Sequence, residues 1–85
     1  MYNYEISGSL DGKLKKLAKK DKIIYERIQK QIIKIAENPK QGKPLRNVLK
    51  GKWRVQIGSF ILIYSIDENL HKVTFLEFEH HDEAY

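Results

Sequence analysis

Cysteine is absent from the 85 residues, and long apolar runs are absent too. Without cysteine the chain has no disulfide framework, thiolate metal site or cysteine nucleophile, and no sign of an oxidising compartment. No stretch approaches the roughly 20 apolar residues that cross a bilayer, and Met1 leads into an alternating Tyr2, Tyr4, Ile6 pattern instead of a signal peptide. We therefore expect a cytoplasmic protein with one domain, residues 1–85, and one modest core.

Negative charge is scarce in the first half of the chain. Residues 1–44 hold 11 Lys/Arg against 5 Asp/Glu, whereas residues 45–85 hold 5 against 6, and the net charge is +5. A basic surface attracts polyanions, namely nucleic acid, an acidic protein or a membrane surface. The alternative is a solvated lysine-rich helical face, and the sequence leaves the run from Lys13 to Lys22 open between the two.

Two helices are predicted after a short strand formed by Tyr2, Tyr4 and Ile6. Ser9 is a good N-cap for the first helix, whose apolar residues recur at helical spacing at Leu10, Leu14 and Leu17. Asp21 starts the second helix, which ends at Asn38-Pro39. Its apolar stripe consists of Ile24, Ile28, Ile32 and Ile35. The segment from Lys40 to Pro44 is then a loop that returns the chain to a sheet.

From Trp53 the apolar period changes to two, which predicts strands. Gly58-Ser59 is a two-residue turn that pairs Ile57 with Phe60 and Arg54 with Ile63, and paired residues share a face. The face toward the helices then holds Trp53, Val55, Ile57, Phe60, Leu62, Tyr64 and Ile66. The opposite, open face presents Arg54, Gln56, Ile61, Ile63 and Ser65. Ile61 and Ile63 make it partly apolar, which is typical of a surface that binds protein.

Val73 to Glu79 forms the last strand. We expect Leu76 and Phe78 to face the helices, which puts Glu77, Glu79 and His81 on the open face with Arg54. The predicted fold class is α+β, in the order β-α-α-β-β-β. An N-terminal helical hairpin packs on one face of a small, mainly antiparallel twisted sheet.

This order and several short motifs resemble the RelE/ParE toxin superfamily. The motifs are Leu45-Arg46, Leu49-x-Gly51-x-Trp53-Arg54-Val55, Ile57-Gly58, Tyr64 and a His-rich end that finishes in Tyr85. RelE-like members, including the YoeB branch, are ribosome-dependent mRNA endonucleases that a cognate antitoxin neutralises, whereas ParE-like members act on DNA gyrase. The resemblance implies an active surface on the concave open face of the sheet.

Cutting RNA without a metal cofactor requires deprotonation of the 2′-hydroxyl, stabilisation of the phosphate and protonation of the 5′-oxygen. Arg54 is the predicted phosphate clamp, because its planar guanidinium can bind two phosphate oxygens. The alternative is an ordinary surface arginine. Arg46, Lys50 and Lys52 lie on or before the same strand, where the resemblance implies cations that bind RNA, and Lys52 is also a catalytic candidate.

His81 is the predicted proton carrier, since imidazole titrates near neutrality. RelE-like relatives often carry an arginine there, and YoeB-like relatives a terminal histidine. Tyr85 matches the C-terminal tyrosine of the family, which can stack on a base or transfer a proton, although it is also a terminal residue that can fray. Glu77 and Glu79 are secondary candidates for a base. His80 ranks behind His81 because it should point to the opposite face.

One departure from the family concerns Ile61, where many active RelE-like toxins carry an arginine. A hydrocarbon cannot bind phosphate, and loss of one such donor costs on the order of 100-fold in rate. Two alternatives to the endonuclease are therefore kept: a ParE-like gyrase inhibitor without nuclease activity, and a degenerate toxin that acts only as a protein-binding module. The expected partners are mRNA in the ribosomal A site, the ribosome, and an antitoxin whose acidic residues cover the open face or wrap the basic helices.

Overall fold

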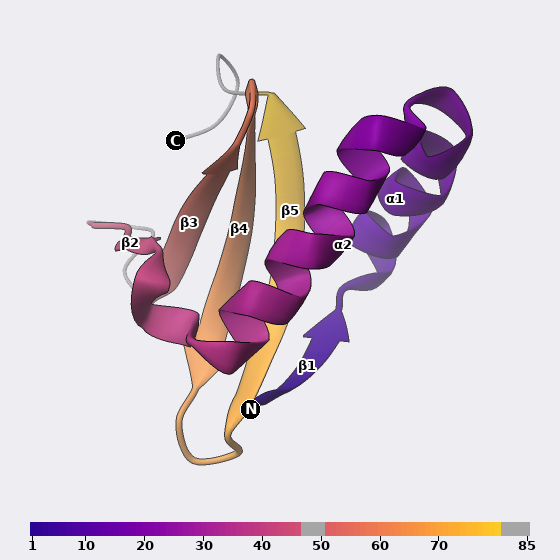
Figure 1. The fold of residues 1–85 in the computed structure, drawn as a ribbon. Helices are drawn as coiled ribbons and strands as arrows, with labels where there is room; N and C mark the ends of the chain where they lie inside the picture. Colours follow the sequence, from indigo (N-terminus) through magenta and orange to yellow (C-terminus); the bar gives the residue numbers. More distant parts are fainter. Residues whose placement is uncertain (47–50, 81–85) are drawn as a thin grey trace.

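Two helices pack on one face of a five-stranded sheet in the computed structural model, which describes residues 1–46 and 51–80 (Figure 1). The elements in chain order are β1 (Asn3–Ile6), α1 (Gly8–Lys20), α2 (Lys22–Glu37), η1 (Pro39–Gln41, a 3₁₀ turn), β2 (Lys43–Pro44), β3 (Lys52–Ile57), β4 (Phe60–Asp67) and β5 (Lys72–His80). The predicted α+β class and element order are confirmed. The predicted loop from Lys40 to Pro44 is wrong in part, because it contains the end of η1 and the two-residue strand β2.

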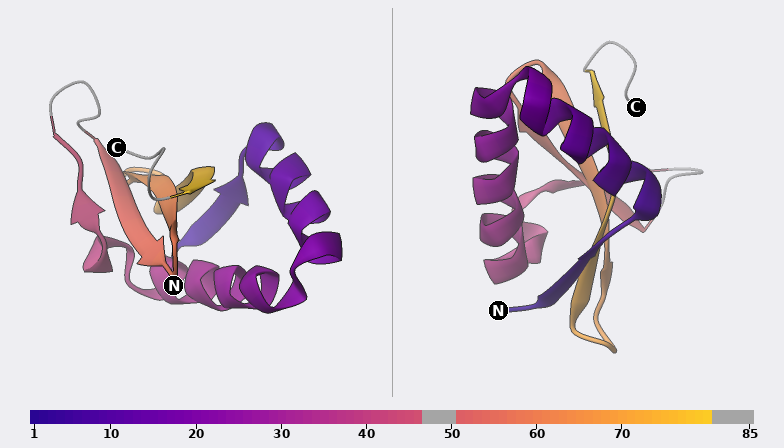
Figure 2. Two further views of the ribbon diagram at one scale, coloured as in Figure 1. Left: turned by 90° about the horizontal axis from the view of Figure 1, so that it is seen from above. Right: turned by 90° about the vertical axis from the view of Figure 1, so that its right-hand side faces the viewer.

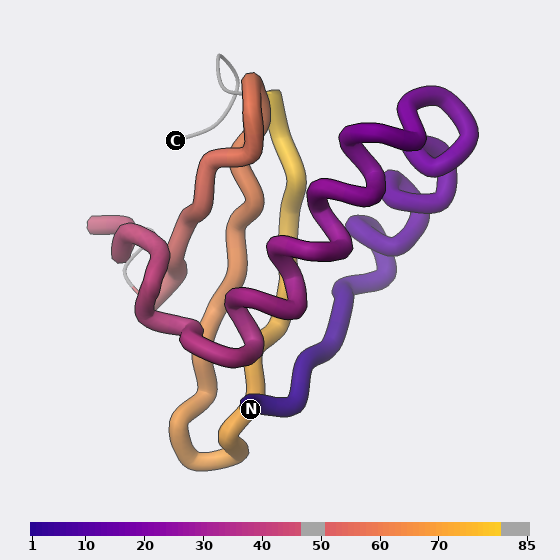
Figure 3. The backbone as a smooth tube through the Cα atoms, in the orientation of Figure 1, coloured from indigo at the N-terminus to yellow at the C-terminus, as the bar shows by residue number. Residues whose placement is uncertain are grey.

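The strands are ordered β1-β5-β4-β3-β2, with β1 parallel to β5 and every other pair antiparallel. The predicted hairpin register is confirmed from the Ile57–Phe60 pair to the Trp53–Tyr64 pair. Gly58 has a φ of 60° in the connecting turn, a conformation that glycine adopts without steric cost. The tube in Figure 3 shows that the start of β1 and the β4–β5 turn lie at the same end of the molecule.

The core lies between the sheet and the helices, whose arrangement Figure 2 shows from above and from one side. Its buried members are Leu10, Leu14, Ile28, Ile32, Ile35, Ile57, Leu62, Tyr64, Val73, Phe75 and Phe78. The predicted leucine and isoleucine stripes of the two helices supply five of these. No helix in residues 1–46 or 51–80 is long and apolar enough to cross a bilayer.

A bulge in β5 changes which side chains face the core. Ile63 pairs with Glu77 while Tyr64 pairs with Phe75, so Leu76 has no partner on β4. The extra residue reverses the alternation, which places Phe75 (0% exposed) and Phe78 (7% exposed) both on the helix side. The prediction for Phe78 is confirmed, whereas the prediction that Leu76 faces the helices is wrong, because strict alternation does not anticipate a bulge.

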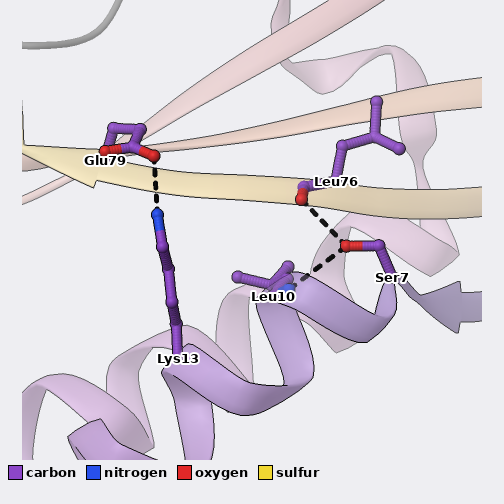
Figure 4. Close-up of polar contacts among 5 residues, drawn as sticks. All are labelled: Ser7, Leu10, Lys13, Leu76 and Glu79. Atoms are coloured by element: carbon purple, nitrogen blue, oxygen red, sulfur yellow. Dashed lines mark hydrogen bonds and ion pairs between the residues drawn. The ribbon is translucent and has the colours of Figure 1, made fainter.

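Ser7, and not Ser9, caps α1. The Oγ of Ser7 accepts a hydrogen bond from the Leu10 backbone N–H at 3.3 Å and donates one to the Leu76 carbonyl at 2.9 Å (Figure 4). The Ser7 backbone N–H also donates to the Phe75 carbonyl at 2.9 Å. Helix α1 therefore begins two residues earlier than predicted, because the strand register already holds Ser7 beside the bulge.

Helix α2 begins and ends where the sequence predicts. The Asp21 carboxylate accepts a hydrogen bond from the Ile24 N–H at 3.2 Å, which satisfies one of the free donors of the first turn. The helix ends at Glu37, just before Asn38-Pro39, because proline has no N–H to continue the helical hydrogen bonds.

Candidate functional site

The open face of the sheet, opposite the helices, carries rows of cross-strand neighbours. One row crosses four strands: Lys43 on β2, Arg54 on β3, Ile63 on β4 and Glu77 on β5. Cross-strand partners share a face, and the residues on both sides of Arg54 pack against the core. Arg54 therefore points away from the helices, as the sequence predicts.

Three further cations lie near Arg54, on β3 or on the segment that pairs with it. Lys52 lies two positions before Arg54 on the same strand and hence on the same face, about 7 Å along the strand. The backbone N–H of Leu45 donates to the Lys52 carbonyl at 2.8 Å, which holds the exposed Arg46 beside the start of β3. Lys43 lies directly opposite Arg54. Sequence reasoning missed Lys43 because it placed residues 40–44 in a loop, and two-residue strands have no readable period.

The two carboxylates of the predicted site have different surroundings. The Glu79 carboxylate forms an ion pair with Lys13 of α1, with 2.6 Å between the Glu79 Oε1 and the Lys13 Nζ (Figure 4). The Glu79 side chain is 28% exposed and the Lys13 side chain 51%. Glu77 lies in the Arg54 row, and two strand spacings, about 10 Å, separate the two backbones. Of the two, Glu77 is the carboxylate that shares a row with the arginine, while Glu79 is attached to α1.

The histidines and the C-terminal tyrosine can be placed only in part. His80 pairs with Phe60, and the two rings meet edge to face with centroids 5.3 Å apart. Since Phe60 packs against the core, His80 lies on the helix side, as predicted, and not with Arg54. His81, Tyr85 and Lys50 lie outside the described residues, so their predicted roles stay predictions.

The prediction that Ile61 and Ile63 make the open face partly apolar is wrong. Ile61 and Ile63 are each only 1% exposed. Both lie on β4, the central strand, where Gln56 and Glu79 flank Ile61 while Arg54 and Glu77 flank Ile63. Neither isoleucine therefore contributes exposed apolar surface to the open face, and the described residues beside them on β3 and β5 are polar or charged.

Tyr64 holds the segment that carries Lys43. Its hydroxyl donates a hydrogen bond to the Pro39 carbonyl at 2.7 Å, and its side chain is fully buried. Burial raises the pKa of Tyr64 to about 12, against a smaller opposing effect of a backbone hydrogen bond from Gly42. A Cβ on Gly42 would collide with the Tyr64 hydroxyl and lie 2.7 Å from the Arg54 carbonyl oxygen. Only glycine fits there, and its close approach sets the distance between β2 and β3.

A pocket of about 220 Å³ opens beside Arg54 at the outer edge of β3. It is lined by Gln31, Gln41, Gly42, Lys43, Arg54, Val55 and Gln56. Each of the three glutamines already donates a side-chain hydrogen bond within the chain, so Lys43 and Arg54 are the lining residues suited to phosphate oxygens.

Comparisons with known proteins agree on one family. The family model described as "ParE toxin of type II toxin-antitoxin system, parDE" matches residues 4–85. The chain is 44% identical over 86 residues to the putative toxin RelE4 of Methanocaldococcus jannaschii, covering 100% of this chain and 92% of that protein.

Two solved structures show the same fold. The toxin-antitoxin complex RelBE2 of Mycobacterium tuberculosis matches with a TM-score of 0.80 and 26% identity, over 93% of this chain and 96% of that chain. The isolated E. coli RelE toxin matches with a TM-score of 0.82 and 14% identity, over 99% and 88% of the two chains.

Proposed function

The chain belongs to the RelE/ParE superfamily as a toxin of a type II toxin-antitoxin system, and from this premise we propose that it is a cytoplasmic, ribosome-dependent mRNA endonuclease. The observation that carries the proposal is the position of Arg54. It lies on the open face, between Lys43 on the neighbouring strand and Lys52 on its own. A fork of guanidinium donors with cations beside it is suited to a phosphodiester.

The proposed reaction uses the 2′-hydroxyl of the substrate as the nucleophile. Its oxygen attacks the adjacent phosphorus, the bond from phosphorus to the 5′-oxygen breaks, and a 2′,3′-cyclic phosphate and a 5′-hydroxyl result. Arg54 binds the two non-bridging oxygens, whose negative charge grows in the transition state. The 2′-proton passes to a base on the protein, and a second proton passes from an acid to the 5′-oxygen.

The proton carriers in this proposal are His81 and Tyr85, with Glu77 as the carboxylate candidate. Glu77 is preferred to Glu79 because it lies in the same cross-strand row as Arg54, whereas the Glu79 carboxylate lies 2.6 Å from Lys13 of α1. Arg46, Lys50 and Lys52 bind the flanking phosphates of mRNA in the ribosomal A site. Each such contact adds sequence-independent, salt-dependent affinity.

An antitoxin is the proposed protein partner, and the M. tuberculosis relative is itself part of a toxin-antitoxin complex. With the isoleucines of the open face buried, charge is the feature that an antitoxin would recognise there. We expect acidic residues that cover Arg54 and its neighbouring cations. Calorimetric titration with the product of an adjacent acidic reading frame tests this, and absence of binding would contradict it.

A second candidate function is inhibition of DNA gyrase without RNA cleavage. Ile61 favours it, because this side chain is buried and apolar where many RelE-like nucleases carry an arginine. The ParE description of the matching family points the same way. A degenerate toxin that only binds protein is the remaining alternative.

Toeprinting on translating ribosomes, run beside a gyrase supercoiling assay, separates these functions. Cleavage products with intact supercoiling support the endonuclease, and loss of supercoiling without cleavage supports the gyrase inhibitor. If neither activity is seen at any toxin concentration that binds the antitoxin, the protein is a binding module, and the endonuclease and gyrase-inhibitor proposals are both wrong.

A further inference from the structure

A second cationic surface lies where α2 meets the outer edge of β3. It contains a pocket of about 220 Å³ lined by Arg27, Lys30, Gln31, Lys34, Gln56 and Ile57, which we name the α2 trough. The trough shares Gln31 and Gln56 with the pocket beside Arg54. The two pockets therefore adjoin, and a path leads from Arg54 around the edge of the sheet onto α2.

The three cations of the trough form a line. Arg27, Lys30 and Lys34 are separated by three and four positions on one helix, so they lie on one face about 4.5 and 6 Å apart along its axis. All three side chains are exposed. Within residues 1–46 and 51–80, the ion pairs of the structure are Lys13–Glu79, Lys15–Asp11 and Lys72–Glu5. None of them neutralises a cation of the trough.

The turn between β3 and β4 leaves room for the first of these cations. A Cβ on Gly58 would lie 3.3 Å from the Nη1 of Arg27, so the guanidinium packs over the bare glycine backbone. Gln56 lies beside it, with its side-chain amide donating to the Gly58 carbonyl at 3.0 Å. Arg27 and Gln56 therefore lie together at one end of the trough, and the hydrogen bond to Gly58 orders the Gln56 amide.

The chemistry of the lining favours nucleic acid over a peptide. Among the described residues that line the trough there is no carboxylate, and Ile57 is its only apolar member. The outer edge of β3 at residues 55–57 pairs with no strand of the described chain and could accept a peptide strand. Peptide recognition of that kind uses side-chain pockets, and protein interfaces have an apolar or aromatic centre. Lysine, arginine and glutamine are instead the usual contacts to phosphate and sugar.

We propose that the α2 trough is a second RNA-binding surface, on the helix side of β3, that takes the phosphodiester backbone of single-stranded RNA. A strand whose phosphate lies at Arg54 continues past Gln56 to Lys34, Lys30 and Arg27. The inference rests on the proposed function in one respect, because RNA is its ligand. It does not depend on cleavage, since binding at the trough requires no reaction.

The test is equilibrium binding of a fluorescein-labelled single-stranded RNA of about 16 nucleotides, followed by anisotropy at several salt concentrations. The trough variant replaces Arg27, Lys30 and Lys34 with glutamine. The matched control replaces Lys16, Lys19 and Lys20 with glutamine as well. These three lysines are exposed on α1, so the control removes the same formal charge from another surface. Circular dichroism melting checks that both variants fold.

Three lost phosphate contacts on a single strand reduce the slope of log K against log salt by about 2. We therefore expect the trough variant to lose affinity on the order of 100-fold at low salt, and the α1 control to keep most of the wild-type slope. Equal losses in the two variants would show a diffuse effect of net charge and overturn the proposal. So would a wild-type protein whose RNA binding does not depend on salt.

A poly-glutamate peptide of similar length tests the other ligand class. If the trough variant loses poly-glutamate binding but keeps RNA binding, the trough is a protein-docking surface and the inference is wrong. The toeprinting assay separates this failure from that of the endonuclease. Ribosomal cleavage with unchanged RNA affinity in the trough variant refutes the trough alone, whereas the expected loss of affinity without any cleavage by the wild type refutes the endonuclease alone.

Discussion

The hydroxyl of Ser7 donates a hydrogen bond to the carbonyl oxygen of Leu76, 2.9 Å away, and so joins the start of α1 to the bulge in β5. The same oxygen caps α1 by accepting from the Leu10 N–H. One side chain therefore connects the start of the helix with the point where the alternation of β5 reverses. The reversal puts Phe75 in the core and leaves Glu77 in the row of Arg54.

Ser7→Ala removes both hydrogen bonds of this junction. We expect the free energy of unfolding to fall by about 1–2 kcal/mol, the usual effect of losing an N-cap. Ser9→Ala is the matched control, because Ser9 is an exposed residue within the first turn of the same helix. Its effect should stay within about 0.5 kcal/mol. Urea denaturation measures both, and equal losses would contradict the assignment of Ser7 as the cap.

The raised pKa of Tyr64, about 12 against 10 in the unfolded chain, makes stability fall at high pH. The folded protein keeps the phenol proton that the unfolded chain releases, so this contribution is fully present below pH 10 and is lost as pH rises toward 12. From about pH 9 to pH 11 the loss is about 1.4 kcal/mol.

Tyr64→Phe removes this titration. Its stability deficit relative to wild type should therefore shrink by about the same amount over that pH range, in urea unfolding at each pH. Tyr4→Phe removes a tyrosine that is 42% exposed and serves as the control. A deficit for Tyr64→Phe that is constant with pH would show that the Tyr64 hydroxyl does not titrate differently in the folded state.

Gly42→Ala tests the close approach of β2 to β3. The added methyl group meets the Tyr64 hydroxyl and the Arg54 carbonyl, so β2 must move, and we expect a loss of about 1–3 kcal/mol. The hydrogen bond from Leu45 to Lys52 should open as well, which faster amide exchange at Leu45 would report. Gly12→Ala is a control with the opposite expected sign. Nothing lies within 4 Å of a Cβ added at Gly12, so alanine in this helix should raise the free energy of unfolding by about 0.4–1 kcal/mol.

Arg54→Ala tests the proposed phosphate clamp. We expect ribosome-dependent cleavage to fall on the order of 100-fold or more, because one donor to the charge of the transition state is lost. Arg54→Lys keeps the charge but loses the bidentate geometry, so its cleavage rate should lie between those of the wild type and Arg54→Ala. Lys16→Ala, on the exposed face of α1, should cleave at the wild-type rate. Full activity in Arg54→Ala would remove Arg54 from the mechanism.

The hairpin of β3 and β4 shows how far local patterns reach. A period of two and the Gly58-Ser59 turn fix its register, so the pairing of Arg54 with Ile63 follows from neighbours in the chain. Helix α2 is equally local, with Asp21 at one end and Pro39 after the other. The class of the fold and the face of Arg54 could therefore be predicted.

Other features depend on contacts between distant residues. The bulge at Leu76 is held by Ser7, 69 positions away, and the position of Lys43 depends on Tyr64 and Pro39, 25 positions apart. Ile61 and Ile63 are buried although they lie on the face turned away from the helices. No periodicity records such pairs, which is why Leu76, Lys43 and the isoleucines were wrongly predicted or missed.

The sequence alone determined the two helices, the hairpin and the side of the sheet on which Arg54 lies, because short-range sterics, hydrogen bonds and apolar periodicity act between residues close in the chain. Only the tertiary structure decided that Glu79 is held by Lys13, that Glu77 and Lys43 join Arg54 in one row, and that Arg27, Lys30 and Lys34 line a trough with β3. These are relationships between elements, and they exist only once hydrophobic burial has brought the elements together.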